Sequence, residues 1–127
     1  MGQDRPLTIL ISTTVNGKPL NSNDLKIKVR VDHRILTLSV TNGRFTVDLQ
    51  KHRENARDVA LTIAYKKYIV TFAELTAGHF QGEWKVMFSK PTFPSEDIPN
   101  PDKVDFVCGI EFRNSEPGTV ITQIKYK

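Results

Sequence analysis

The sequence predicts an all-β fold, an antiparallel β-sandwich of about 7–9 short strands that forms a single domain over residues 1–127. Three observations support this fold class. Apolar residues alternate with polar ones along most segments, turn-forming residues recur about every 8–12 residues, and no long segment has the period of a helix. Residues 90–103 carry four of the seven prolines, and such an extended connection suits a chain that passes from one sheet to another.

Composition and charge are those of an ordinary globular domain. Charged residues make up 25% of the sequence and hydrophobic residues 39%, a balance typical of a chain that folds around one core. The net charge of +4 permits an acidic partner without requiring one, because solubility alone favours a charge away from zero. No apolar run approaches the roughly 18 residues of a membrane span, so no span is expected.

The segments 7–15 and 25–32 show the clearest strand alternation. In the first, apolar residues share one parity, and Leu10 is the exception. The second, LKIKVRVD, alternates without interruption. Its inward face is predicted to carry Leu25, Ile27, Val29 and Val31, and its outward face Lys26, Lys28, Arg30 and Asp32.

The stretch SVTNGRFTVDL, residues 39–49, predicts a β-hairpin. A two-residue turn at Asn42–Gly43 is a strong hairpin signal, and it sets Thr41 opposite Arg44. The same register predicts three apolar pairs on one face, namely Val40 with Phe45, Leu38 with Val47, and Leu36 with Leu49. Turn chemistry and hydrophobic pattern therefore agree on one pairing.

Two further turn sites can be tested by register. A two-residue turn at Asn16–Gly17 would set Pro19 opposite Thr14 and lose the apolar match, so this site is predicted to be a loop. A turn at Lys66–Lys67 keeps the apolar match, although Lys-Lys is poor turn chemistry. Its predicted pairs are Tyr65 with Tyr68, Ile63 with Val70, and Leu61 with Phe72.

The second half of the chain is also predicted to consist of strands. Residues 72–82 are compatible with one short helical turn, and their two glycines exclude a longer helix. A strand is expected at residues 83–89. Its inward side is predicted to carry Trp84, Val86 and Phe88. Strands are expected again at residues 103–113 and 119–127, with a turn between them.

The first half of the chain resembles the transthyretin-like, or prealbumin-like, sandwiches, particularly the carboxypeptidase regulatory-like modules. The likeness covers roughly residues 8–72 and consists of a Gly-x-Pro turn, an Asn-Gly-x-Phe turn and a strand that ends near a tyrosine. The matching residues are Gly17, Pro19, Asn42, Gly43, Phe45 and Tyr68. The resemblance implies a sandwich of seven or more strands that acts as a spacer, folding or interaction module and is usually extracytoplasmic. Beside this prealbumin-like fold, an Ig-like sandwich is the alternative.

The same family contains an enzyme, hydroxyisourate hydrolase, and this chain lacks the residues that would carry its chemistry. The enzyme's first strand holds a catalytic histidine, whereas Thr14 lies in that neighbourhood here. Its final Tyr-Arg-Gly-Ser has no counterpart in the closing residues IKYK. No nucleophile, base and orienter can be named together, so the sequence predicts a protein that is not an enzyme and that needs no cofactor.

Metal and thiol chemistry are not expected either. His33, His52 and His79 are scattered, without a second histidine or a cysteine at ligand spacing. The acidic stretch SEDIPNPD lacks the ordered spacing of a calcium loop. Cys108 is the only cysteine, so no intrachain disulfide is possible, and its apolar surroundings predict a small buried side chain.

Lys26, Lys28 and Arg30 are the candidate contacts to a polyanion. They project from one face of a predicted strand and can neutralise phosphate or similar groups. Sheets that bind nucleic acid usually carry aromatic rings on the same face for stacking, and this strand has none, so nucleic acid is not expected. Outward lysines also protect an edge strand from aggregation, which is the simpler interpretation.

Phe80, Trp84 and Phe93 are the candidate ligand contacts. Aromatic rings with polar neighbours suit sugars or extended peptides. Trp84 has the inward parity of its strand, which favours a place in the core, whereas Phe80 and Phe93 lie in predicted loops. Only exposed rings would support a carbohydrate site.

These features favour a non-catalytic binding or interaction module. It would recognise a protein or glycan partner by a sheet edge or by the loops at one end of the sandwich. A small carbohydrate-binding module is the first alternative and a weak polyanion-binding domain the second. Only the family resemblance favours an extracytoplasmic location, and no pattern in the sequence indicates an oligomeric state.

Overall fold

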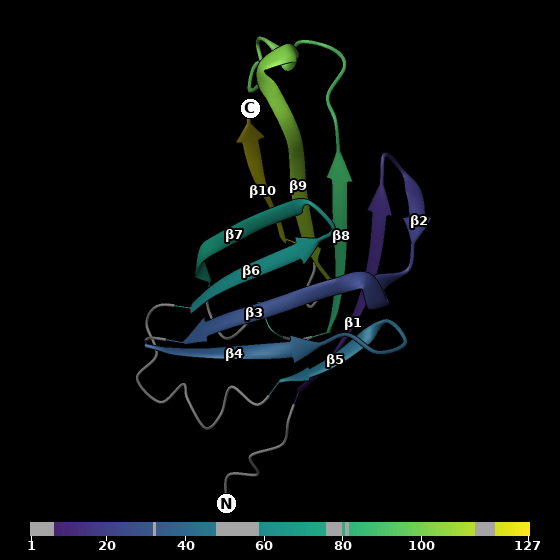
Figure 1. Ribbon diagram of the computed structural model, residues 1–127, viewed down its shortest axis with the longest axis vertical. Helices are drawn as coiled ribbons and strands as arrows, with labels where there is room; N and C mark the ends of the chain where they lie inside the picture. The colour runs from purple at the N-terminus through teal and green to yellow at the C-terminus, as the bar shows by residue number, and fades with distance from the viewer. Residues whose placement is uncertain (1–6, 32, 48–58, 76–79, 81, 114–118) are drawn as a thin grey trace, which may run out of the picture.

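The computed structural model is a sandwich of two β-sheets, and the prediction of an all-β sandwich is confirmed. The structure describes residues 7–31, 33–47, 59–75, 80, 82–113 and 119–127. In Figure 1 the strands of one sheet run across those of the other, an arrangement found when two sheets pack with crossed strand directions.

The six-stranded sheet has the spatial order β10, β9, β8, β1, β2, and β5 also pairs with β1. Its strands are β1 (Leu7–Val15), β2 (Lys18–Leu20), β5 (Arg44–Val47), β8 (Glu83–Ser89), β9 (Val104–Phe112) and β10 (Thr119–Tyr126). The four-stranded sheet has the order β4 (Arg34–Ser39), β3 (Leu25–Val31), β6 (Val59–Tyr65), β7 (Tyr68–Leu75).

The described residues form ten strands, which exceeds the predicted 7–9, and the extra strand is the short β2. Two 3-10 helices, η1 (Ser22–Asp24) and η3 (Pro101–Lys103), complete the described elements. In the part of the chain that the structure describes, no helix is long and apolar enough to cross a membrane.

The predicted alternation along β1 and β3 is confirmed. Every second side chain of β3 is buried and the intervening ones are exposed. In β1 the side chains of Ile9, Ile11 and Thr13 are buried, whereas Leu10, the exception in the sequence pattern, is 47% exposed. Among the described strands all pairs are antiparallel except β1 with β8, which is parallel.

The turn at Asn42–Gly43 forms, but the predicted hairpin does not extend beyond it. Thr41 and Arg44 exchange two backbone hydrogen bonds of 2.9 and 3.1 Å. Both turn residues have the positive φ of a type I′ turn, 53° and 72°. After this one bridge, β4 pairs with β3 in the four-stranded sheet and β5 pairs with β1 in the six-stranded sheet.

The apolar cross-strand pairs predicted around this turn are wrong for a physical reason. β4 and β5 belong to different sheets, but both turn every second side chain toward the same core. Their alternation of inward and outward residues is therefore the same as it would be in a hairpin. Hydrophobic pattern specifies which face is buried but not which strand is the neighbour. The pairs that do not form are Val40 with Phe45 and Leu38 with Val47; in the third, Leu36 with Leu49, Leu49 lies outside the described residues.

Two passages between the sheets meet at this turn, at what we call the corner. The chain enters the four-stranded sheet through η1 and leaves β4 through Asn42–Gly43. The amide of Ile11 in β1 donates to the Gly43 carbonyl at 2.7 Å, and the Gly43 amide donates to Asn23 Oδ1 at 3.3 Å. The Ser22 hydroxyl donates to the Ile11 carbonyl at 3.1 Å. These bonds attach both passages to the middle of β1.

Asn16–Gly17 forms a two-residue hairpin turn, so its prediction as a loop is wrong. Val15 faces Lys18 and Thr14 faces Pro19 in an antiparallel pair that lasts only three positions. Strand β2 is exposed and lies at a sheet edge, where proline is tolerated and no apolar register has to match. The turn at Lys66–Lys67 is confirmed, with all three of its predicted pairs.

The proline-rich segment of residues 90–103 does not change sheets, contrary to prediction. It joins β8 to β9, which are antiparallel neighbours in the six-stranded sheet. Proline has no amide to donate to a ladder, so the chain leaves the sheet after β8 and returns to it through η3. The strands expected at residues 103–113 and 119–127 are confirmed, and the turn between them lies outside the described residues.

The helical turn expected within residues 72–82 is not formed in the part that can be compared. Strand β7 continues to Leu75, with a bulge opposite β6 and a positive φ of 60° at Glu74. Residues 76–79 and 81 lie outside the described part of the chain. Residues 72–75 therefore extend the four-stranded sheet.

The core between the sheets contains an aromatic cluster around Trp84, whose side chain is fully buried. Its ring centroid lies 5.2 Å from those of Phe45 and Phe80 and 5.3 Å from that of Phe112, each in an edge-on arrangement. Aromatic pairs of this geometry contribute about 0.5–1.5 kcal/mol each beyond the area they bury. The cluster thereby packs β5, β8 and β9 against one another on the inner face of their sheet.

Replacing Gly43 by alanine is expected to destabilise the protein more than replacing Gly17. Both glycines have left-handed backbone, with φ of +72° and +81°, which costs a residue with a side chain about 1–2 kcal/mol. A Cβ at Gly43 would also lie 3.3 Å from the Ile11 carbonyl oxygen, whereas one at Gly17 meets nothing within 4 Å. Urea unfolding of the two variants measures the difference, and equal losses would contradict a steric restriction at the corner.

Candidate functional site

Two of the three predicted aromatic ligand contacts belong to the core. Phe80 and Trp84 are each 0% exposed, so neither ring is available to a ligand and their prediction as contacts is wrong. Phe93, in the connection between β8 and β9, is 81% exposed and stays a candidate alone. The inward parity of Trp84 signalled its burial, whereas nothing in the sequence around Phe80 did.

Cys108 is buried in β9, as its apolar neighbours predict. Burial raises the pKa of the thiol to about 12, because the thiolate would lose its hydration. The thiolate is the nucleophilic form of cysteine, so this side chain is inert near neutral pH. Its contribution is that of a small hydrophobic residue.

The histidines and carboxylates are the side chains that could form a metal site. His33 is exposed between β3 and β4, and His52 and His79 lie outside the described residues. Within the described ranges, no group of three His, Cys, Asp or Glu side chains is placed to hold a metal ion. For the chain as a whole, the absence of a metal stays a prediction.

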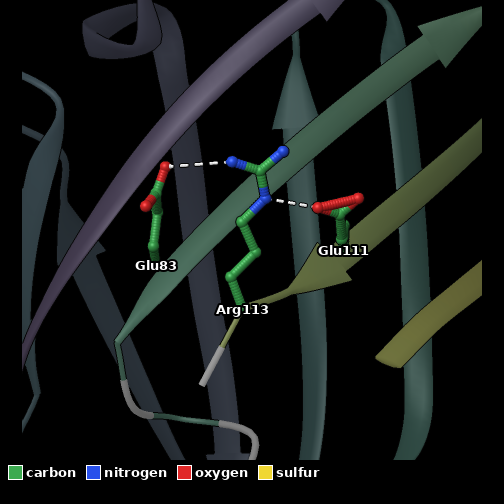
Figure 2. Close-up of polar contacts among 3 residues, drawn as sticks. All are labelled: Glu83, Glu111 and Arg113. Atoms are coloured by element: carbon green, nitrogen blue, oxygen red, sulfur yellow. Dashed lines mark hydrogen bonds and ion pairs between the residues drawn. The ribbon is translucent and has the colours of Figure 1, made fainter. Parts of the chain in front are cut away.

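Arg113 lies at the centre of the ion-pair cluster in Figure 2. Its Nε donates to Glu111, and its Nη1 lies 3.7 Å from Glu83 Oε1. The hydrogen bond and the charge of Glu111 raise the pKa of Arg113 above its ordinary value. The Arg113 amide also donates to the Glu83 carbonyl at 2.8 Å. The cluster therefore ties the ends of β8 and β9 together, which is a structural role.

Lys26, Lys28 and Arg30 project from the outer face of the four-stranded sheet, on the side that the sequence predicts. Their strand β3 lies between β4 and β6 (Figure 1) and is paired on both sides. The interpretation that these cations protect an edge strand is therefore wrong, because β3 is not an edge. Their exposed positions still agree with a solvated outer face.

The rest of this outer face consists of small, hydroxyl and aliphatic side chains. They are Ile35, Thr37 and Ser39 from β4, Ala60, Thr62 and Ala64 from β6, and Ile69, Thr71 and Ala73 from β7. Together with Lys26, Lys28 and Arg30 they form what we call the basic face. These twelve described residues include three cations, and the carboxylate of Glu74, exposed at the bulge of β7, borders them beside Ala73. The face is thus electropositive and free of large rings.

Lys28 occupies the middle row of the basic face. Its neighbours across the sheet are Thr37 on β4 and Thr62 on β6, and the hydroxyls of Thr62 and Thr71 are hydrogen-bonded at 3.0 Å. A shallow hollow of about 210 Å³ lies alongside. Its lining is Lys28, Arg30, Ile35, Ala60, Thr62, Thr71 and Ala73. The row places an ammonium group beside hydroxyl donors, a combination that suits acidic oxygen atoms.

Sequence reasoning identified the three cations but not the hollow beside them. The cations follow from the period of one strand, whereas the hollow needs the register of four strands at once. Ala60 and Ala73 leave its space open because their side chains are short. Alanine in a strand carries no such signal when the neighbouring strand is unknown.

Comparison of the chain with protein-family models, with curated proteins and with solved structures gives no match. The likeness to transthyretin-like modules consequently stays a prediction. Any function has to be inferred from the surfaces of the molecule itself, and the basic face is the most distinctive of them.

Trp84 fluorescence is expected to be blue-shifted and resistant to acrylamide, because its ring is fully buried among three phenylalanine rings. The spectrum is expected to stay unchanged across a panel of soluble polysaccharides. A red-shifted spectrum that responds to a sugar would restore Trp84 as a ligand contact.

Iodoacetamide is expected to leave Cys108 unmodified in the folded protein at pH 8 and to alkylate it in urea. At a pKa of about 12, roughly one thiol in 10⁴ is ionised at that pH. The stabilising effect of this shift is fully present below 9.0, the ordinary pKa, and is lost as the pH rises toward about 12, because the unfolded thiol ionises first. Mass spectrometry measures the modification; rapid alkylation without urea would show that the core opens at Cys108.

Proposed function

We propose that this protein is a non-catalytic interaction module that binds an extended acidic segment of a partner protein across its basic face. The observation that carries the proposal is the pair of lysines Lys26 and Lys28 on a strand that is paired on both sides, in a face whose one bordering described carboxylate is Glu74 at the bulge of β7. The like charges of Lys26 and Lys28 on one strand face repel one another, and an acidic partner would relieve that repulsion.

The spacing of the cations favours a polypeptide in extended conformation. Alternate residues of a strand lie about 6.6–6.8 Å apart, twice the rise per residue. An extended peptide with Asp or Glu at every second position repeats its carboxylates at the same interval. The two sets of charges match in register over three positions.

The chemistry of the basic face also distinguishes among anionic partners. Single-stranded nucleic acid binds best where aromatic rings stack on its bases, and the twelve described residues include none. Hydroxyl groups of Thr37 and Thr62 lie beside Lys28, where they can donate to a carboxylate. Ile35 and Ile69, which are 67% and 54% exposed, provide apolar contacts at the two outer strands. A peptide with acidic and aliphatic side chains meets all of these groups.

Replacing Lys26 and Lys28 together by alanine is expected to weaken the binding of the labelled peptide (Glu-Thr)₆ about 2- to 30-fold. The estimate takes about 0.2–1 kcal/mol for each exposed ion pair that is lost. Fluorescence anisotropy at low salt measures the affinity, and 0.5 M NaCl is expected to abolish most of it because the charges are solvent-exposed. The peptide (Glu-Glu-Thr-Thr)₃ has the same composition but a different spacing and is expected to bind less tightly.

The matched control is the double variant Lys103→Ala and Lys127→Ala. It removes the same net charge from exposed lysines near the start of β9 and the end of β10, and it is expected to retain binding. Equal losses of peptide affinity in the two double variants would show that binding depends on net charge alone. That result would contradict specific binding at the basic face. Tight binding of an oligonucleotide with no binding of either peptide would assign the face to nucleic acid instead.

A further inference from the structure

A second hollow lies at the end of the sandwich between the β1–β2 hairpin and the β6–β7 turn. Its volume is about 390 Å³, within the range of about 300–1,000 Å³ that small-molecule sites occupy. Its lining is Val15, Leu20, Tyr65, Lys66, Lys67 and Tyr68, and we call it the end hollow. Four of these residues are aliphatic or aromatic, two are cations and none is acidic.

Aromatic packing makes the base of the end hollow rigid. Phe88 stacks against both Tyr65 and Tyr68, with ring centroids 5.8 and 5.4 Å away, and the Tyr68 ring also contacts Phe106 edge-on at 4.8 Å. Tyr65 is 3% exposed and Leu20 is 37% exposed. The apolar surface is therefore anchored in the core on one side and open to solvent on the other.

The turn that borders the end hollow has an unfavourable sequence. Lys66 has a positive φ of 54°, a conformation that asparagine and glycine adopt far more readily. Among the described residues, the turns Asn16–Gly17 and Asn42–Gly43 have positive φ at both positions and carry Asn-Gly, whereas in this turn only Lys66 has a positive φ. A lysine held in a disfavoured backbone conformation is a reason to look for a function of its side chain.

The two lysines of this turn are placed over the tyrosines that flank them. Lys66 Nζ lies 5.6 Å from the Tyr65 ring centroid, and Lys67 Nζ lies 5.6 Å from that of Tyr68. Cation–π contacts of this length orient an ammonium group without neutralising its charge. Two positive charges are thereby held beside an apolar surface.

We propose that the end hollow binds an aliphatic carboxylate, with its carboxylate between Lys66 and Lys67 and its hydrocarbon chain against Val15, Leu20 and the half-buried Tyr68 ring. Burial of the chain supplies affinity, and the ammonium groups select for the acidic head. This site is separate from the basic face and does not depend on the function proposed for it. Charge complementarity and the apolar lining together define the ligand class.

The proposal is tested with decanoate, decanol and acetate as probes in isothermal titration calorimetry. Decanoate is expected to bind with one site, whereas decanol lacks the charge and acetate lacks the chain, so both are expected to bind at least about tenfold more weakly. Amide chemical shifts in an NMR titration are expected to change at residues 15–20 and 65–68. Undetectable decanoate binding, or decanol binding as tight as that of decanoate, would overturn the proposal.

The decisive variant combines Lys66→Gly with Lys67→Asn, which puts glycine at the turn residue that has a positive φ. The variant is expected to unfold at the same or a higher temperature, because its turn is the more favourable one, and to bind decanoate at least about tenfold more weakly. Opposite changes in stability and binding distinguish lost recognition from lost folding. Unchanged decanoate affinity in this variant would refute the role of the lysines.

Two further measurements test whether decanoate binds at the end hollow and not at the basic face, and whether the natural ligand is a peptide. The double variant Lys26→Ala and Lys28→Ala is expected to bind decanoate as the unmodified protein does; a loss there would place the ligand on the basic face. An acetylated dipeptide that ends in leucine tests the other source of an apolar carboxylate. Tighter binding of this dipeptide than of decanoate would reassign the end hollow to the C-terminus of a protein.

Discussion

The hydrogen bond from the Ile11 amide to the Gly43 carbonyl is the constraint on which the rest of the sandwich depends. Along one edge of β1, the pairing with β5 runs from Leu7 to Leu10, the bond to the corner comes next, and the pairing with β2 runs from Thr13 to Val15. One edge thus accepts three successive partners. Because η1 is attached to the same place, the corner also sets where β3 begins, and with it the position of the basic face.

Sequence patterning predicted which side chains are buried much better than which strands are neighbours. Burial parity belongs to each strand alone, so the two faces of β3 were predicted in detail. The pairing of β6 with β7 was also predicted, because a two-residue turn joins these strands directly. Strands pair through backbone amide and carbonyl groups, which are the same in nearly every residue. The hydrophobic pattern of β5 is therefore compatible with pairing to β1 as well as with pairing to β4. The same ambiguity applies to residues 90–103, whose prolines exclude a ladder but do not indicate where the chain returns.

The candidate surfaces were predictable to the extent that they arise from one strand. Lys26, Lys28 and Arg30 share a face because of the strand period, but their place in the middle of a sheet comes from pairing on both sides. Phe80 is buried by contacts that no local pattern announces. The sequence shows that Lys-Lys is an unfavourable pair for the β6–β7 turn. It does not show that the hairpin of β1 and β2 borders the same hollow as this turn.

The parallel pairing of β1 with β8 has a consequence for the order of folding. The first described strand of the chain lies inside the six-stranded sheet, and one of its edges is completed only by a strand that comes after six others. During synthesis that edge is exposed until β8 emerges, and an unpaired strand edge is a template for association with other chains. Such non-local pairing also slows folding, because a long loop must close before the contact forms. This strand order therefore exposes the protein to association mainly through the time that the chain spends partly folded, and less through the stability of the final fold.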